Sequence, residues 1–98
     1  MGRQVSLTRL AEGDLEEIVG YIAQDHPRAA LKVGQQIIEK LRHLADFPLS
    51  GRIVPEFEEE NLREIVHSHY RIIYLLHPEQ DRIDVIRIWH GARGEPEI

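Results

Sequence analysis

Apolar residues recur at helical spacing in two consecutive stretches of the first half of the chain. The first stripe consists of Ala11, Leu15, Ile18, Val19 and Ile22. The second consists of Ala30, Val33, Ile37, Ile38, Leu41, Leu44 and Ala45. Side chains repeated at such three-, four- and seven-residue spacings share one face of a helix. Each stretch is therefore predicted to form an amphipathic helix.

The residues around these stripes indicate where the helices begin and end. Thr8 is suited to cap the first helix, because its hydroxyl can accept a hydrogen bond from a free backbone N–H. Pro27 suits the first position of the second helix, where its missing N–H costs nothing. The break between them is short, which predicts an antiparallel hairpin. Residues 47–51 end the second helix with turn chemistry.

The remaining apolar runs are short and rich in β-branched and aromatic residues, which favours strands. They span residues 3–7, 52–54, 62–67, 70–76 and 82–89. The run at 70–76 is apolar on both faces apart from Arg71, which is typical of a central strand. Residues 67–69 are predicted to turn, residues 56–60 to form an acidic loop, and residues 78–81 to form a hairpin loop. Gly94 and Pro96 disfavour a regular element at the end.

The predicted order is β-α-α-β-β-β, with one further small strand at residues 52–54. This is an α+β fold, in which the helical hairpin packs on one face of a small, mostly antiparallel sheet. The opposite face is expected to carry the polar residues that alternate with the apolar ones. Residues 1–98 form a single domain in this prediction, because the length leaves no room for a second core.

Composition narrows the classes of function. The formal net charge of -5 makes a protein that covers nucleic acid with its whole surface a poor candidate. Positive charge comes mostly from arginine, with Lys32 and Lys40 the only lysines, and there is no cysteine for disulfides or thiolate chemistry. The chain has no long apolar run and no basic-then-apolar start, so membrane and secretory roles are excluded and a cytoplasmic location is predicted.

Several short sequence words follow one another in a fixed order. They are AEGDLEEI at 11–18 with YI at 21–22, Pro27 with AA at 29–30, FPLSGR at 47–52, VPE at 54–56, LRE at 62–64, YRIIY at 70–74 and HGAR at 90–93. Together with the order of elements, they resemble the ParE/RelE superfamily of type II toxin–antitoxin toxins over nearly the whole chain. The resemblance implies a small bacterial toxin held inactive by a cognate antitoxin, whose carboxy-terminal segment wraps the toxin's helices and sheet edge.

The superfamily divides by target. RelE-like members cut messenger RNA on the ribosome, whereas ParE-like members, known as plasmid stabilisation toxins, poison DNA gyrase and are not nucleases. Ribonuclease chemistry needs cations for the phosphate and groups that move protons. Arg63 and Arg93 stand where RelE-like toxins place phosphate-stabilising arginines, and His90 titrates in a range suited to a substitute acid or base. These three residues are the catalytic candidates if the chain is a ribonuclease.

Other features of the RelE branch are missing. No tyrosine or His-Tyr pair lies near the carboxy terminus, and there is no lysine-rich patch. The HGAR word also resembles ParE more than RelE. The sequence therefore favours a ParE-like gyrase inhibitor without cofactor. Two alternatives stay open: a RelE-like ribosome-dependent endoribonuclease, and a non-toxic relic that only binds an antitoxin. Whether the chain is an enzyme depends on which alternative holds.

Five residues are candidates for contacts with the target or the antitoxin, namely Arg63, Arg71, Arg87, His90 and Arg93. Each arginine also has a structural interpretation. Arg63 can pair with Glu64 or with the acidic loop, and Arg93 can simply be exposed. Arg71 and Arg87 either line an exposed sheet face or pair with Asp84 or a loop glutamate, because a charge within an apolar strand must reach solvent or a carboxylate.

Three further groups were weighed. His67 and His69 could share a face and bind zinc, but no third ligand stands at fixed spacing, so no metal site is predicted. Tyr70, Tyr74 and Trp89 are interpreted as core or sheet-face aromatics. Surplus apolar residues on the helices, including Leu10, Tyr21 and Leu31, suit an antitoxin groove or a dimer face. The expected partners are thus an antitoxin and gyrase, or alternatively the ribosome and messenger RNA, without sequence-specific DNA binding by this chain alone.

Overall fold

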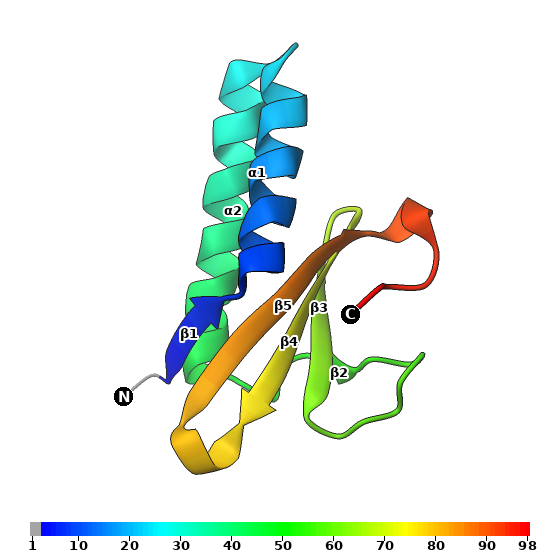
Figure 1. Ribbon diagram of the computed structural model, residues 1–98. Helices are drawn as coiled ribbons and strands as arrows, with labels where there is room; N and C mark the ends of the chain where they lie inside the picture. The colour runs from blue at the N-terminus through cyan, green and yellow to red at the C-terminus, as the bar shows by residue number, and fades with distance from the viewer. Residues whose placement is uncertain (1–2) are drawn as a thin grey trace.

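Two helices lie on one side of a five-stranded sheet in the computed structural model, which describes residues 3–98 (Figure 1). The elements are β1 (Gln4–Leu7), α1 (Arg9–Ala23), α2 (Pro27–Asp46), β2 (Arg52–Ile53), β3 (Leu62–His67), β4 (Tyr70–His77) and β5 (Arg82–His90), with 3-10 turns η1 (Pro78–Gln80) and η2 (Gly91–Arg93). No helix of this part of the chain is long and apolar enough to span a membrane.

The strands lie in the order β1-β5-β4-β3-β2. β1 runs parallel to β5, and the other neighbouring pairs are antiparallel. The α+β prediction and its mostly antiparallel sheet are confirmed, and β2 is the further small strand. β4 is the central strand, as its apolar residues on both faces predicted.

Thr8 joins the start of α1 to the sheet. Its Oγ1 accepts a hydrogen bond from the Ala11 N–H at 3.2 Å, which confirms the predicted cap. The same hydroxyl donates to the Ile86 carbonyl of β5 at 3.2 Å, and the Thr8 N–H donates to the Val85 carbonyl. These bonds fix where the chain leaves β1 and how α1 crosses the edge of β5.

The main core lies between the hairpin and the sheet. Its buried members are Ala11, Ile37, Leu41, Leu44, Ile72, Tyr74, Leu76, Ile83, Val85 and Ile88. The helix residues among them belong to the two predicted stripes, and the strand residues come from β4 and β5. The core therefore follows from the helical and alternating patterns of the sequence.

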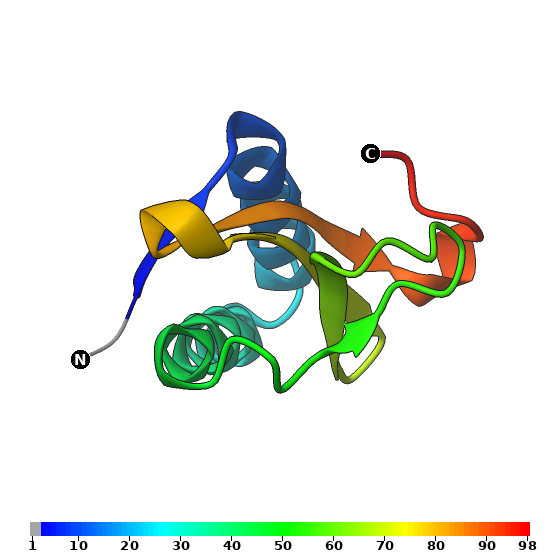
Figure 2. The same cartoon turned by 90° about the horizontal axis from the view of Figure 1, so that it is seen from below.

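A second apolar cluster lies on the opposite face of the sheet, where polar side chains were expected, so that prediction is wrong. The cluster consists of Val54, Leu62, Ile73 and Trp89, with Leu75 and Ile86 partly buried beside it. The linker after β2 and the chain after β5 both run along this face, away from the helices (Figure 2). They shield the cluster from water, and Pro96 of the tail is itself buried.

Gly51 allows the linker to approach the sheet closely. Its N–H donates to the Tyr74 hydroxyl at 3.0 Å, and that hydroxyl donates to the Pro48 carbonyl at 2.9 Å. A Cβ at this position would lie 2.5 Å from the Glu64 carbonyl oxygen and would also collide with the Tyr74 hydroxyl. Glycine is therefore required here by space.

Replacing Gly51 with alanine should destabilise the fold by about 2–3 kcal/mol, because the new methyl group displaces the linker and breaks its bond to Tyr74. Gly13→Ala is the matched control, since nothing lies within 4 Å of a Cβ there and alanine favours the helix by about 1 kcal/mol. Urea denaturation measures both free energies of unfolding. Equal stability of Gly51→Ala and the unmodified chain would contradict the role given to Gly51.

Candidate functional site: the arginines of the sheet

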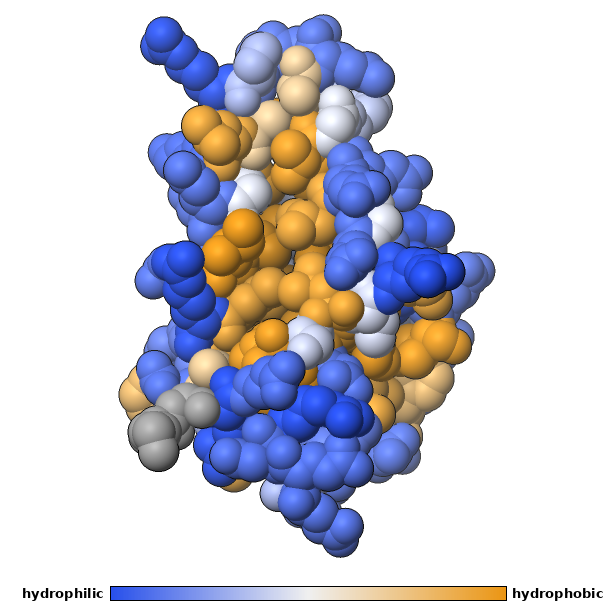
Figure 3. Space-filling model, turned by 60° about the vertical axis from the view of Figure 1, so that its left-hand side comes forward, coloured by the Kyte–Doolittle hydropathy of each residue, from blue (hydrophilic) through white to orange (hydrophobic). Residues whose placement is uncertain are grey.

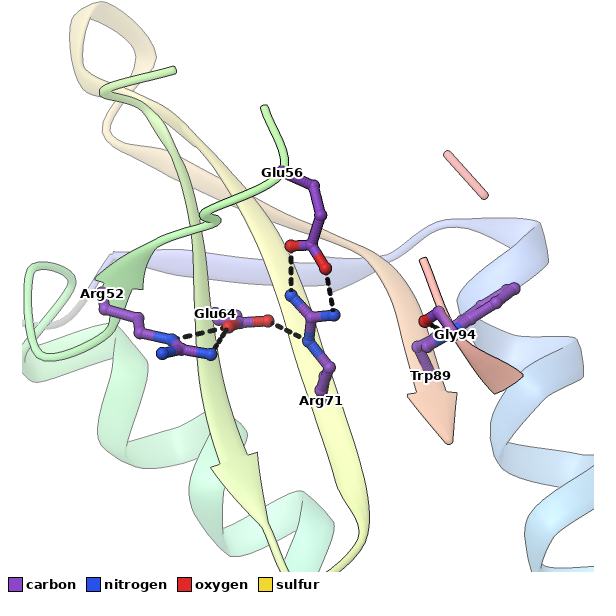
Figure 4. Close-up of polar contacts among 6 residues, drawn as sticks. All are labelled: Arg52, Glu56, Glu64, Arg71, Trp89 and Gly94. Carbon is purple, nitrogen blue, oxygen red and sulfur yellow. Dashed lines mark hydrogen bonds and ion pairs between the residues drawn. The ribbon is translucent and has the colours of Figure 1, made fainter. Parts of the chain in front are cut away.

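Glu64 is the centre of a charge network on the outer face of the sheet. Its side chain is completely buried on β3. Arg52 of β2 donates to one carboxylate oxygen at 2.7 Å, and the Arg71 Nε of β4 donates to the other (Figure 4). Because an unpaired buried charge is strongly destabilising, these two arginines are a structural requirement of Glu64.

Arg71 holds a second carboxylate at the same time. Its two terminal nitrogens donate to both oxygens of Glu56 at 2.7 and 2.9 Å (Figure 4). The Arg71 guanidinium lowers the pKa of Glu56 from 4.5 to about 2. Hydrogen bonding to Glu56 in turn raises the pKa of Arg71 above its usual value. Of the two alternatives for Arg71, the structure shows the pair with a loop glutamate.

Arg87 bonds to Asp14 of α1. Its Nε and Nη2 donate to the two carboxylate oxygens of Asp14 at 2.8 and 2.9 Å, and this hydrogen bonding raises the pKa of Arg87. The expected partners, Asp84 or a loop glutamate, are wrong for this residue. Asp84 instead contacts His77 and Arg82.

Asp14 is the functional-face residue that the sequence interpretation missed. It also accepts a hydrogen bond from the Ile88 N–H of β5 at 2.9 Å, so it bonds the edge of β5 beyond the end of β1. Asp14 lies near the start of a helix, where an acid is ordinary. Its position on the buried stripe, between Ala11 and Ile18, was the signal of a burial that needs a partner.

Arg63 bonds to backbone carbonyls rather than carboxylates. It donates to Glu60 and to Gly51, each at 3.1 Å. The expected ion pair with Glu64 or with an acidic loop side chain is therefore wrong, although the Glu60 carbonyl belongs to that loop. Arg63 braces both ends of the linker against β3.

Arg93 is the exposed arginine of the set. Its guanidinium carbon lies 4.1 Å from the centre of the Trp89 ring, in a cation–π contact, and no carboxylate of residues 3–98 lies within ion-pair distance of it. Trp89 Nε1 donates to the Gly94 carbonyl at 3.0 Å (Figure 4), and Arg87 donates to the Glu97 carbonyl at 2.9 Å. The tail is thus bonded to the outer face.

His90 ends β5 beside Arg93. Its Nδ1 accepts a hydrogen bond from the Ala92 N–H at 3.1 Å, and its ring contacts His69 and Tyr70. His90 and Arg93 line one hollow of about 290 Å³ with Tyr21, Tyr70 and acidic residues of α1. The structure therefore brings these two predicted residues together.

Arg63 is distant from that hollow. Register pairs Arg63 with Tyr74, whereas His90 pairs with Tyr70. Those positions are four residues apart on β4, or roughly 13 Å at the rise of a strand. The three residues considered for ribonuclease chemistry do not form one site. The two histidines of the H-x-H word also separate, since His67 contacts Gln36 and His69 stacks with His90.

Removing the Glu56 charge tests the network through its pH dependence. The folded-state pKa of Glu56 lies below 4.5, so its pairing stabilises the fold above that pH, and the contribution is lost as pH falls towards 2. Glu56→Gln should lower the free energy of unfolding by about 1 kcal/mol at pH 7, and this difference should shrink between pH 4.5 and 2.

Glu59→Gln in the same linker is the control and should leave stability unchanged across this range. Thermal unfolding of the three proteins at several pH values gives the differences. A Glu56→Gln difference that stays constant down to pH 2 would show that the Arg71 contact does not hold the Glu56 charge.

Comparison with solved structures shows how widely the fold is shared. The chain is similar to a toxin of the chromosomal ParDE system from P. aeruginosa, with 23% identity, a TM-score of 0.72, and coverage of 90% of this chain and 95% of that one. It is also similar to a chain of the RelBE2 toxin–antitoxin complex from Mycobacterium tuberculosis, with 20% identity, a TM-score of 0.68, and coverage of 92% and 99%. A search of curated proteins gives no match.

The family is shown by a direct sequence match. Residues 5–94 match the family model described as ParE toxin of type II toxin-antitoxin system, parDE. This range contains both helices, nearly all of the sheet and all five candidate residues. The predicted superfamily is confirmed, and the chain belongs to the ParE toxin family of type II toxin–antitoxin systems.

Proposed function

We propose that this ParE-family toxin inhibits DNA gyrase and is neutralised by a cognate antitoxin. The observation that carries the choice of target is the occupancy of its arginines. Arg71 and Arg87 are bonded to carboxylates of the chain, and Arg63 is bonded to carbonyls. A ribonuclease needs free cations at the reacting phosphate. Only Arg93 of this set fulfils that requirement among residues 3–98.

The covered outer face supports the same choice. RNA cleavage requires a surface on which the strand can lie, with proton-transfer groups beside the phosphate. Here the linker and tail lie over the apolar cluster around Trp89, and Glu56 brings negative charge to Arg71. Such a face repels phosphate and is better suited to contacts with a protein.

The end of β5 is the proposed contact for gyrase. Arg93 and His90 line the same hollow as Tyr21 and Tyr70, and Arg93 is held in place by Trp89. Arginine and aromatic residues are the types that contribute most to protein interfaces. Arg71, Arg87 and Arg63 act in this proposal by holding the tail and linker, without touching the target.

The groove between the helices is the proposed antitoxin site. An apolar band runs down the outer side of the hairpin (Figure 3). Leu31 and Ile38 of α2 share one side of that helix, and their exposures are 63% and 44%. They lie one turn before and after Gly34, where α1 approaches through Val19. An amphipathic helix of a partner fits an apolar groove of this kind.

The gyrase proposal predicts that the purified protein, incubated with gyrase, supercoiled plasmid and ATP, causes linear plasmid to accumulate. Arg93→Ala should lower this activity about tenfold or more, because an exposed arginine at an interface contributes on the order of 2 kcal/mol. Arg42→Ala is the control, since Arg42 is exposed on α2 and makes only a 3.4 Å contact with Glu39. The antitoxin should reverse the effect.

Two results would replace the proposal. Messenger RNA cleaved on the ribosome, with the cleavage lost in both Arg93→Ala and His90→Ala, would assign the chain to the endoribonuclease alternative. Expression that neither arrests growth nor affects gyrase or the ribosome would instead indicate a relic that only binds its antitoxin.

The antitoxin site predicts that Ile38→Asp weakens binding of the antitoxin at least about tenfold, because the groove loses an apolar anchor and gains an unpaired charge. Lys32→Asp introduces the same side chain on another side of α2 and should change affinity little. Isothermal titration measures both. Equal losses in the two variants would place the antitoxin elsewhere or show a purely electrostatic contact.

A further inference from the structure

A second groove lies between α2 and β3. Two adjoining hollows of about 330 and 440 Å³ share Lys40 and His43 as lining residues. One continues to Arg52, Ile65 and Val66, and the other continues to His67. Helical spacing places Lys40 and His43 on a different side of α2 from Leu31 and Ile38. This groove is therefore separate from the proposed antitoxin site.

The floor of the groove includes an open strand edge. β2 pairs only with Arg63 and Glu64, and no other part of residues 3–98 continues this pairing along β3. The Val54 N–H donates to the Leu62 carbonyl, so alternation along β3 directs the backbone groups of Val66 towards the same edge. An unpaired edge of this kind accepts an added strand.

The rim of the groove is basic, although the chain has a net charge of -5. Lys40, one of only two lysines, lies there with His43, Arg52 and His67. Lys40 has no ion pair within the described residues. The carboxylates beside them are Glu39 and Glu64, and Glu64 is already bonded to Arg52 and Arg71.

We propose that the groove between α2 and β3 binds an extended acidic peptide segment of a partner protein. The segment adds to β3 through the backbone of Val66, with apolar side chains over Ile65 and carboxylates towards Lys40 and His43. A peptide explains the open edge and the apolar floor together. Nucleic acid would use neither feature, and it would require more cations than this rim provides.

Fluorescence anisotropy with short labelled peptides tests the chemistry of the site. The probes are ten-residue peptides that alternate Glu with Val, Lys with Val, or Glu with Ser. The Glu–Val peptide should bind at least about tenfold more tightly than either of the others, because only it carries both the charge and the apolar side chains. Its affinity should fall when salt is raised from about 50 to 500 mM.

Two pairs of variants place the peptide in the groove. Lys40→Glu should weaken binding of the Glu–Val peptide at least about fivefold, whereas Lys32→Glu, the same change elsewhere on α2, should not. Val66→Pro removes the outward N–H and should also weaken binding, while Val66→Thr keeps it. Circular dichroism confirms that each variant is folded, and Lys40→Glu alone remains decisive if Val66→Pro does not fold.

Three outcomes would overturn the proposal. They are equal affinity for the Glu–Val and Lys–Val peptides, unchanged affinity in Lys40→Glu, and tighter binding of a ten-nucleotide oligothymidine that displaces the peptide. The last result would make the groove a phosphate site. None of these measurements depends on gyrase or on the antitoxin, so the proposal stands or fails separately from the proposed function.

Discussion

The buried carboxylate of Glu64 is the constraint on which the outer half of the molecule depends. A charge inside a protein must be neutralised by close partners, and Glu64 obtains them from Arg52 of β2 and Arg71 of β4. Arg52 thereby holds a two-residue edge strand that has few other bonds. Arg71 extends the network to Glu56 and brings the linker over the sheet. The cover of the second apolar cluster is therefore a consequence of one buried acid.

This arrangement explains how one fold can be compatible with different targets. The chain shares its architecture with structures from a ParDE system and from a RelBE complex. Strand and helix positions are common to both, so they cannot distinguish a nuclease from an inhibitor of another kind. The distinguishing feature lies in what each arginine contacts. In this chain the strand arginines serve the protein's own carboxylates and carbonyls, and the exposed guanidinium of Arg93 is left for a partner.

Helices, strands and the Thr8 cap could be predicted from the sequence because each rests on local spacing or on a single side chain near its partner. The arginine partners could not be predicted in the same way. Asp14 and Arg87 are 73 positions apart, and an acid near a helix start has an ordinary local explanation. The apolar residues on both faces of β4 did indicate a second buried face. The segment that covers it, however, has Gly94 and Pro96 in place of a periodic pattern, so its docking depends on Trp89 and tertiary structure.

Arg87 connects three parts of the molecule through a single guanidinium. It bonds to Asp14 of α1, bonds to the Glu97 carbonyl of the tail, and lies 5.0 Å from the Trp89 ring. Lysine at this position would keep the charge but lose the planar fork that reaches both carboxylate oxygens and the tail together. A force that tilts α1 is therefore transmitted to the tail on the far side of β5. Two partners, one on the hairpin and one at the tail, would influence each other's affinity without sharing a surface.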